Sequence, residues 1–546
     1  MFERRVVAAW AAFGGIAAVS AALVWRRPEA QRLSDLHIYY GAAKFDGPLY
    51  DYVAENGGPF TYPPFAMVLF RPLSMLPEAT LGALWLAMTC VAVIAIARTV
   101  TRTGPGTADC AAQNGNGRLR GWLDAHGGRG LLVAGIASAL LVSAPVQSNL
   151  RFGQVSIFIV LLALVDAGQV VPARFRGVLV GVAAAIKLTP LLFVVYFLVA
   201  RRYKDAARAA GAFVVCAGIA AAVMPGASVR YWSGTIFQTS RIGDLASLGN
   251  QSVHGMLLRI GLDAGTLPVV WAALIAAICG AALLRARRLH LGVLSGPSDR
   301  DRTGAVVLQG EPVRAAVLVG CATVAASPVS WTHHQVWTVL AAMLLVAAEG
   351  AWHRVAGVTL LVVMTVSLGV ALRGIAVYPG WQFMLENARS LGLVAVCVAG
   401  VGGVVVAGMP RFRAARRVAV GVAVALAVLA LTPLPAGADP TFKAYQAADL
   451  TNPRYFYFTG APAAGEPVAF AVRREKTKVR VNGVVGAEVA GLRYTSAPGG
   501  AARVIPLLEA QPGRRTFSFR SASLTHGRLE ALDAAGQVKA TFTHLQ

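Results

Sequence analysis

The sequence predicts a polytopic α-helical membrane protein with about eleven full spans and a proline-broken helix pair, followed by a small C-terminal all-β domain. The first observation is composition: 56% of the 546 residues are hydrophobic and 14% are charged, whereas about a quarter of the residues in soluble proteins are charged. The second is that the apolar residues lie in long runs. One core cannot bury that much apolar surface, so lipid must solvate much of it. Ordinary soluble enzymes, disordered tails and secreted disulfide scaffolds are excluded.

The apolar runs give the spans, because a helix needs ~20 apolar residues to cross ~30 Å of hydrocarbon. Such runs lie at 7–25, 79–97, 130–146, 155–171, 209–225, 267–284, 314–328, 335–349, 355–372, 391–408 and 418–434. The first lacks a small-residue cleavage site. We therefore interpret it as an anchor that starts in the cytoplasm behind Arg4 and Arg5.

The run at 177–200 differs from the others because Lys187 and Pro190 interrupt it and basic clusters flank both of its ends. The positive-inside rule therefore predicts that both ends of this segment lie on the cytoplasmic side. A helix from Arg176 to Lys187 rises by ~16 Å, so two half-helices that meet here would place the lysine near the bilayer midplane.

The net charge of +24 comes from 50 Lys and Arg against 26 Asp and Glu. In a soluble protein it would suggest nucleic acid, but here the basic residues cluster between apolar runs. They indicate topology, and no nucleic-acid partner is expected. Outer loops are predicted at 26–78, 226–266 and 373–390, and cytoplasmic linkers without chemistry at 98–129 and 285–313.

The chain is predicted to divide into a transmembrane domain at 1–434 and an extracytoplasmic β-rich domain at 435–546. The linker LTPLPAGADP separates them, and short runs such as KVRVNGVV and TFSFRS favour strands of a sandwich or barrel. Proteolytic release at this linker is an alternative, because the preceding residues resemble a signal-peptide end. The six cysteines form no CxxC pair, so neither a disulfide framework nor a zinc site is expected.

Asp35 is the candidate general base, because it follows the first span, where a carboxylate can face both water and a lipid headgroup. A solvated loop aspartate is the alternative. Other polar residues close to the hydrocarbon should pair or bind a ligand, because their burial there is costly. They are His333 and His334 in SPVSWTHHQVW, Asn250 and Gln251 in NQSVHG, and Arg151 and Gln154 in SNLRFGQVS. The two histidines have no third ligand at motif spacing, so no metal site is expected. Snorkelling to the headgroups is the alternative for Arg151.

Six motifs in order, DLHIYYGAAKFDGPLY, FTYPPFAMVLFRPLSMLP, RFGQVSIFIVLLAL, GVAAAIKLTP, NQSVHGMLLR and SPVSWTHHQVW, resemble the polyprenyl-phosphate-sugar-dependent glycosyltransferases of the C superfold. The likeness is to family 87, with its actinobacterial α-mannosyltransferases and an arabinofuranosyltransferase. The resemblance implies a GT-C-like fold with its active site on the outer face of the cytoplasmic membrane. It also implies inverting transfer from a polyprenyl monophosphate sugar, and it places the family's catalytic aspartate on Asp35. The C-terminal β-domain and the long 98–129 linker depart from simpler members.

We therefore expect a mannosyltransferase that moves mannose from polyprenyl-phosphate mannose to a lipid-linked or envelope glycan acceptor among membrane lipids. The residues expected to bind the phosphate or the sugar of the donor are His333, His334, Lys187, Arg151, Gln154, Asn250, Gln251, Tyr39, Tyr40 and Tyr62. The first four are the candidates for the leaving phosphate, and the tyrosines are candidates for stacking on the sugar. A position in the membrane interface is the alternative for the tyrosines, and pairing with a neighbouring carbonyl is the alternative for Lys187. No metal or other cofactor is expected. Arabinofuranosyl transfer, a transporter or flippase, and an envelope scaffold are the alternatives. The sequence shows no internal repeat, which disfavours a transporter.

Overall fold

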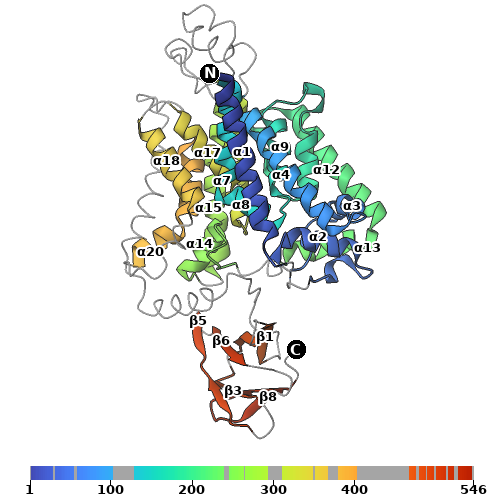
Figure 1. Cartoon of the computed structure of the whole chain (residues 1–546), viewed down its shortest axis with the longest axis vertical. Helices are drawn as coiled ribbons and strands as arrows, with labels where there is room; N and C mark the ends of the chain where they lie inside the picture. Colours follow the sequence, from blue (N-terminus) through green and yellow to red (C-terminus); the bar gives the residue numbers. More distant parts are fainter. Residues whose placement is uncertain are drawn as a thin grey trace, which may run out of the picture. The chain divides into compact units, whose positions relative to one another are not determined.

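A computed structural model of the chain separates into two compact units. The first comprises Met1–Thr239 and Leu245–Ala427, and the second comprises Ser240–Asp244 and Val428–Gln546. The described helices belong to the first unit and the described strands to the second (Figure 1). The structure describes residues 2–28, 31–54, 58–101, 128–238, 245–262, 265–292, 310–348, 351–366, 379–401, 467–474, 479–486, 488–496, 500–511, 514–521 and 527–543.

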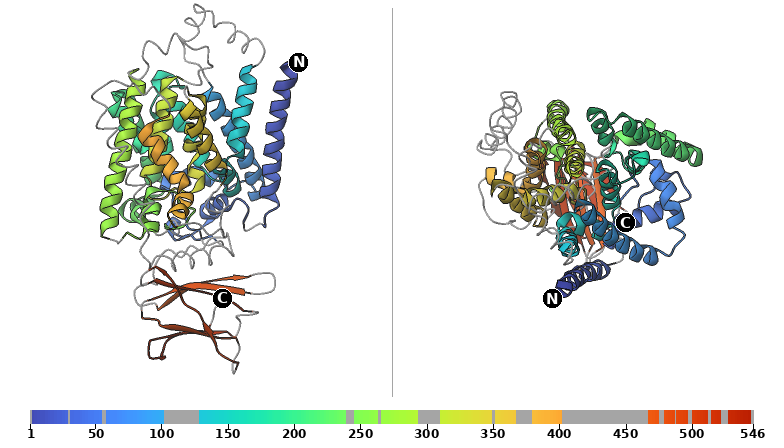
Figure 2. Two further views of the ribbon diagram at one scale, coloured as in Figure 1. Left: turned by 90° about the vertical axis from the view of Figure 1, so that its left-hand side faces the viewer. Right: turned by 90° about the horizontal axis from the view of Figure 1, so that it is seen from above.

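Long apolar helices form the frame of the helical unit. Four described helices are long and apolar enough to cross a membrane: α1 (Phe2–Trp25), α4 (Glu78–Val100), α12 (Tyr203–Val223) and α15 (Thr266–His290). A fifth candidate is the pair α7 (Gly128–Val142) and α8 (Ala144–Phe152), which is bent by 67°. Helix α1 lies at the edge of the unit beside α7 (Figure 2), and only 11% of its apolar window is buried. Such exposure of apolar side chains fits contact with lipid.

Shorter helices complete the unit. They are α2 (Ser34–Lys44), α3 (Pro64–Leu73), α9 (Ser156–Ala167), α10 (Val178–Ile186), α11 (Leu191–Val199), α13 (Pro225–Ser233), α14 (Val253–Ile260), α16 (Glu311–Ala326), α17 (Val336–Ala347), α18 (Ala351–Thr365), α20 (Pro379–Glu386) and α21 (Ala388–Ala399). Single 3-10 turns lie at Leu49–Asp51, Ala173–Phe175, Thr235–Phe237 and Thr332–His334. Helices α3, α13 and α16 carry proline in their first turn, where the missing N–H has no intrahelical partner to lose.

The structure breaks the 177–200 segment where the sequence predicts the break. Helix α10 ends at Ile186, Lys187 adopts an extended conformation, and α11 begins after Pro190. Proline causes the interruption because it disfavours helical geometry in the residue before it and donates no hydrogen bond. Lys187 therefore lies in the short non-helical segment between α10 and α11.

The span count of about eleven stays a prediction, because several apolar helices are shorter than 18 residues. The expected span at 418–434 and the boundary at 434/435 lie outside the described residues, as do residues 102–127 and 293–309 of the two expected linkers. Helix α15 continues to His290, so the 285–313 segment begins as helix.

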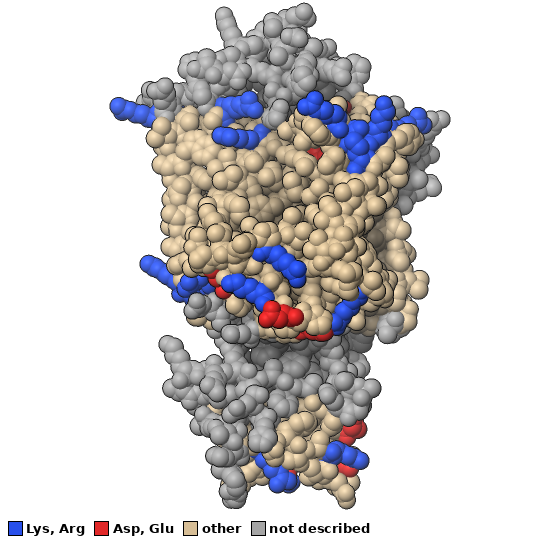
Figure 3. All heavy atoms as spheres, turned by 90° about the vertical axis from the view of Figure 1, so that its right-hand side faces the viewer, with Lys and Arg blue, Asp and Glu red and all other residues tan. Residues whose placement is uncertain are grey.

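Charge is distributed unevenly over the helical unit. On the face in Figure 3, Lys and Arg gather toward its two ends and leave a band of uncharged side chains between them. Such a band is expected where hydrocarbon contacts a protein. Helices α2, α3, α13 and α14 lie at the end opposite the N-terminus of α1 (Figure 1), which is the end that the predicted topology assigns to the outer face.

The second unit contains two four-stranded antiparallel sheets. Their strands are β1 (Val468–Arg474), β2 (Val479–Val485), β3 (Gly491–Thr495), β4 (Arg503–Ile505), β5 (Leu508–Gln511), β6 (Arg514–Ser521), β7 (Arg528–Leu532) and β8 (Val538–Phe542). The strand orders are β1-β2-β6-β5 and β4-β3-β7-β8. Val481 pairs with Phe519 across β2 and β6, and both join a buried cluster with Leu492, Phe517 and Leu529.

Candidate active site

Asp35 lies in the first turn of α2, where the partial positive charge of a helix N-terminus favours a carboxylate. The backbone N–H of Leu33, just before the helix, donates to the carbonyl of Arg151 at 3.2 Å. This bond fixes the start of α2 against the end of α8. The Asp35 side chain is partly accessible, as a group that meets a substrate must be.

Gln154 binds the Asp35 carboxylate directly. Its amide Nε2 donates to Asp35 Oδ2, and its Oε1 accepts from the hydroxyl of Tyr62 at 3.0 Å. The hydroxyl of Tyr39 donates in turn to that of Tyr62 at 2.9 Å, and the Tyr39 ring stacks on Phe70 at 4.5 Å between centroids. The two tyrosines thereby orient the amide so that its NH₂ group faces the carboxylate. The structure thus brings Asp35, Gln154, Tyr39 and Tyr62 into one hydrogen-bonded network.

The turn after α8 places Gln154. Gly153 adopts a left-handed conformation with φ of 65°, which glycine tolerates best. A Cβ at this position would lie 2.6 Å from the Cβ of Leu36 in α2. Only a residue without a side chain permits α8 and α2 to approach this closely, and that approach puts Gln154 beside Asp35.

Lys187 and His334 form a second contact of the site. Lys187 Nζ lies 2.8 Å from His334 Nε2 and donates to Ser156 Oγ at 3.3 Å. The ammonium group also lies 5.1 Å from the centroid of the Tyr62 ring, so this pair borders the network around Asp35. The break between α10 and α11 thus aims the lysine at the loop that joins α16 to α17.

The hydrogen bonds of His334 limit the charge of this pair. The backbone N–H of Trp331 donates to His334 Nδ1 at 3.1 Å, so Nδ1 acts as an acceptor. If both His334 and Lys187 were fully protonated, N–H groups would oppose each other at both ring nitrogens. The pair therefore holds at most one positive charge in this arrangement.

His333 is buried beside His334. The two rings meet edge to face at 4.3 Å between centroids, and His333 Nδ1 is a buried atom without a hydrogen-bond partner among the described residues. A buried polar atom without a partner is uncommon and indicates a place for a ligand or water. The backbone carbonyl of His333 accepts from Asn149 Nδ2 at 3.0 Å. This bond fixes residues 327–335 between α16 and α17, which we call the histidine loop, to α8.

Asn250 and Gln251 stabilise the histidine loop through backbone groups. Asn250 Oδ1 accepts from the N–H of Ser330 at 2.8 Å. Gln251 Nε2 donates to the carbonyl of Glu386 at 2.7 Å, and both side chains are buried. The Asn250 bond, together with the backbone N–H of Gln251 that donates to the Ser330 carbonyl at 2.8 Å, positions the loop, whereas the Gln251 side chain ties this segment to α20. Neither buried amide is exposed to a substrate.

Two predicted site residues lie apart from the Asp35 network. The Tyr40 hydroxyl accepts from Lys44 Nζ at 2.6 Å and donates to the carbonyl of Leu76. The Arg151 guanidinium lies over the Phe152 ring at 4.9 Å, and its Nε has no partner among the described residues. Among the residues that the structure describes, neither side chain forms a hydrogen bond or ion pair with Asp35 or Lys187.

Three polar residues that the sequence analysis did not select support the site. Ser156 accepts from Lys187, and Asn149 Oδ1 accepts from the N–H of Ile157 at 3.1 Å, which holds the start of α9. Arg389 donates to Thr332 Oγ1 at 3.2 Å beside the histidines. A charged residue at the edge of the apolar run 391–408 was the available signal for Arg389.

Burial raises the pKa of the Asp35 carboxyl from 3.8 to about 7, although the nearby Lys187 charge and a hydrogen bond from Ser34 lower it. A carboxyl with a pKa near neutrality can exchange a proton at physiological pH, as general acid-base chemistry requires.

Within the described residues, no three His, Cys, Asp or Glu side chains gather in a way that would hold a metal ion.

Comparison with known proteins identifies a glycosyltransferase family that this chain resembles. Residues 60–308 match the profile of glycosyltransferase family 87. A polyprenol-phosphate-mannose-dependent alpha-(1-2)-phosphatidylinositol mannoside mannosyltransferase of Mycolicibacterium smegmatis is 33% identical over 334 residues, which cover 59% of this chain and 70% of that protein. A polyprenol-phosphate-mannose-dependent alpha-(1-2)-phosphatidylinositol pentamannoside mannosyltransferase of Mycobacterium tuberculosis is 33% identical over 338 residues, which cover 59% and 69%. No solved structure gives a significant match.

Proposed function

Because the chain belongs to glycosyltransferase family 87, we propose that it transfers mannose from polyprenyl-phosphate mannose to a lipid-linked acceptor, with inversion at the anomeric carbon. The names of its relatives give the donor and the kind of acceptor, a phosphatidylinositol mannoside. The observation that carries the mechanism is a partly accessible carboxylate, held by Gln154, next to a lysine and histidine pair.

Asp35 is the general base in this proposal. Its carboxylate accepts the proton of the acceptor hydroxyl as the oxygen forms a bond to the anomeric carbon of mannose. The bond between that carbon and the phosphate oxygen breaks, and polyprenyl monophosphate leaves on the opposite face, which inverts the configuration. The Gln154 amide binds Oδ2, and the other oxygen, Oδ1, accepts only a long bond of 3.4 Å from Ser34 among the described residues, so we assign Oδ1 to the acceptor hydroxyl.

Lys187, His334 and His333 receive the leaving phosphate. The transition state of glycosyl transfer develops negative charge on the leaving oxygen, and preorganised donors and cations stabilise such charge. Lys187 and His334 already contact each other, while His333 offers a buried ring nitrogen that has no partner in the described part of the chain. With these groups at the phosphate, the proposed reaction proceeds without a metal ion.

We place the reaction on the outer face of the cytoplasmic membrane, with the C-terminal β-rich unit on the same side. The placement rests on basic residues in the predicted cytoplasmic loops and on the position of α2 at the end of the helical unit opposite the N-terminus. Neither arabinofuranosyl transfer nor transport is favoured by any contact among the described residues.

Transfer by isolated membranes tests the function. Membranes that contain the protein should move radiolabelled mannose from polyprenyl-phosphate mannose to an extracted phosphatidylinositol mannoside, and membranes without it should not. A polyprenyl-phosphate arabinose donor in the same assay serves as the comparison. Transfer of arabinose with no transfer of mannose would overturn the proposal.

A further inference from the structure

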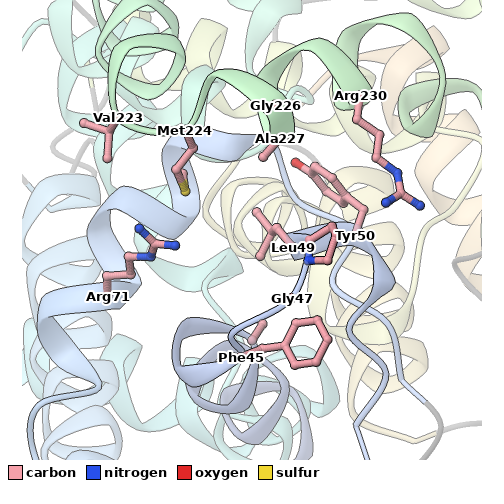
Figure 4. A pocket seen from close by; sticks show the side chains of 12 residues that line it. Phe45, Gly47, Leu49, Tyr50, Arg71, Val223, Met224, Gly226, Ala227 and Arg230 are labelled. Carbon is pink, nitrogen blue, oxygen red and sulfur yellow. The ribbon is translucent and has the colours of Figure 1, made fainter.

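A cavity of about 330 Å³ lies beside the candidate site, between the C-terminal part of α2, the end of α3 and the start of α13 (Figure 4). Its walls include Phe45, Leu49, Tyr50, Arg71, Met224 and Arg230. None of the proposed catalytic residues lines it. We call this cavity the Arg71 pocket.

Positive charge converges on the Arg71 pocket. Figure 4 shows Arg71 and Arg230 on opposite sides of it, with the backbone of α13 at Gly226 and Ala227 between them. The first N–H groups of a helix lack intrahelical partners and favour an anion. The twelve lining residues include two arginines and no carboxylate.

The two arginines differ in whether their guanidinium groups already have a partner. Arg230 donates to Asp51 at 2.5 Å, and both side chains are about half exposed. The Arg71 side chain is exposed and makes no hydrogen bond or ion pair among the described residues. A guanidinium with free donors matches phosphate oxygens in geometry and charge. Arg71 is therefore the group in this pocket that is ready to bind a phosphate.

The pocket is connected to the candidate site through α2 and Tyr50. Ala42 lines the pocket and lies two helical turns after Asp35, on the same face of α2, which is a distance of ~10 Å along the axis. The hydroxyl of Tyr50 donates to the backbone carbonyl of Tyr62 at 2.9 Å. A phosphate in the pocket would thus lie a short oligosaccharide's length from the base.

Exposed apolar side chains at the mouth of the Arg71 pocket match a lipid ligand. Phe45 is 39% exposed and Val223 is 54% exposed, and both line the pocket. Apolar side chains at the mouth of a cationic pocket fit a molecule with acyl chains beside a phosphate.

We propose that the Arg71 pocket binds the phosphodiester of the acceptor lipid, so that the acceptor's sugars extend along α2 to Asp35. The inference rests on the proposed mannosyl transfer and adds the part of the acceptor that the enzyme recognises. The phosphate could come from the acceptor or from the donor, and the kinetic test separates these two sources.

The test uses the full-length protein in vesicles and the variant Arg71→Gln. With a phosphatidylinositol mannoside acceptor, we expect the acceptor KM to rise by about 10- to 100-fold, the usual effect of losing a hydrogen bond to a charged group. The donor KM should stay at its wild-type value. With an alkyl mannoside acceptor that lacks phosphate, wild type and variant should have the same KM.

Two further variants complete the test. Arg26→Gln removes an exposed charge at the end of α1 and should leave the acceptor KM unchanged. Gly226→Asp adds a carboxylate to the first turn of α13, where a Cβ meets nothing within 4 Å, and it should raise the acceptor KM without harming folding.

The proposal is overturned if Arg71→Gln leaves the acceptor KM unchanged, raises the donor KM instead, or raises the KM of the phosphate-free acceptor equally. An equal effect of Arg26→Gln would also overturn it, because bulk surface charge would then explain the result. Wild-type protein that transfers mannose to neither acceptor would instead contradict the proposed function.

Discussion

The Asp35 carboxylate owes its position to one side chain that is remote in sequence. Gln154 lies 119 residues after Asp35 and donates to it. The sequence singled out Asp35 by its place after the first span, Lys187 because it interrupts an apolar run, and the histidines because polar residues near the hydrocarbon are costly. It also flagged Gln154, but as a donor-binding residue, because spacing does not show which distant polar residues share a hydrogen bond.

The pH dependence of turnover follows from the pKa of about 7 of Asp35. The base acts in its ionised form, so activity should be half-maximal near pH 7, approach its maximum about one pH unit above it, and fall about tenfold per pH unit well below it. Initial rates in membranes between pH 5 and 8.5 measure the profile. A flat profile from pH 5 to 8 would contradict the role of this carboxyl.

Lys187 should act on the donor. Lys187→Met removes the charge near the carrier phosphate, so we expect the donor KM to rise by about 10- to 100-fold. Because Lys187 also lowers the pKa of Asp35, the midpoint of the pH profile should move upward. Lys44→Met is the control, since Lys44 contacts Tyr40 away from the site. If the Lys187→Met protein is present at its normal abundance and its donor KM is unchanged, Lys187 does not act on the donor and its role is structural.

At the scale of elements, two helix breaks illustrate what a sequence can show. The break between α10 and α11 is predictable because Lys187 and Pro190 interrupt an apolar run. The 67° bend between α7 and α8 was not predicted, because 130–146 was interpreted as one span. Pro145, in the first turn of α8, was the local signal, but the bend matters only because it carries α8 toward α2.

The turn at Gly153 should be sensitive to a single methyl group. Gly153→Ala costs roughly 1–2 kcal/mol for the left-handed backbone and brings a Cβ to 2.6 Å from that of Leu36. The resulting shift of Gln154 should reduce turnover by at least about tenfold, since small displacements of catalytic groups are costly.

Gly135→Ala in α7 is the matched control for Gly153→Ala, because a Cβ there meets nothing within 4 Å. Turnover per folded protein, with thermal stability measured in parallel, distinguishes the two variants. Wild-type turnover in Gly153→Ala would show that the close approach of α8 and α2 is not required.

At the scale of the whole molecule, the sequence identified the two histidines, but it showed neither the Arg71 pocket nor the contact that joins His334 to Lys187. The pocket combines residues near 45, 71 and 227 from three separate segments. The composition sufficed for the membrane class, because lipid contact requires an apolar surface whatever the packing. The position and lining of a pocket depend on how distant segments pack together, and composition does not specify this packing.

The topology predicts which positions can be labelled from outside the cell. In a cysteine-free background, Asp46→Cys and Ala534→Cys should react with an impermeant maleimide on intact cells, and Tyr203→Cys should react only after permeabilisation. All three positions are exposed. The reverse pattern would place the site on the cytoplasmic face.

The central claim is that Asp35 is the base of a mannosyl transfer, and Asp35→Asn tests it most directly. The amide preserves the shape of the carboxyl and removes its basicity. We expect turnover of polyprenyl-phosphate mannose to fall by ~10²–10⁴-fold while donor binding, measured by equilibrium titration of the same membranes, stays at the wild-type level. Near wild-type turnover in Asp35→Asn would contradict the account.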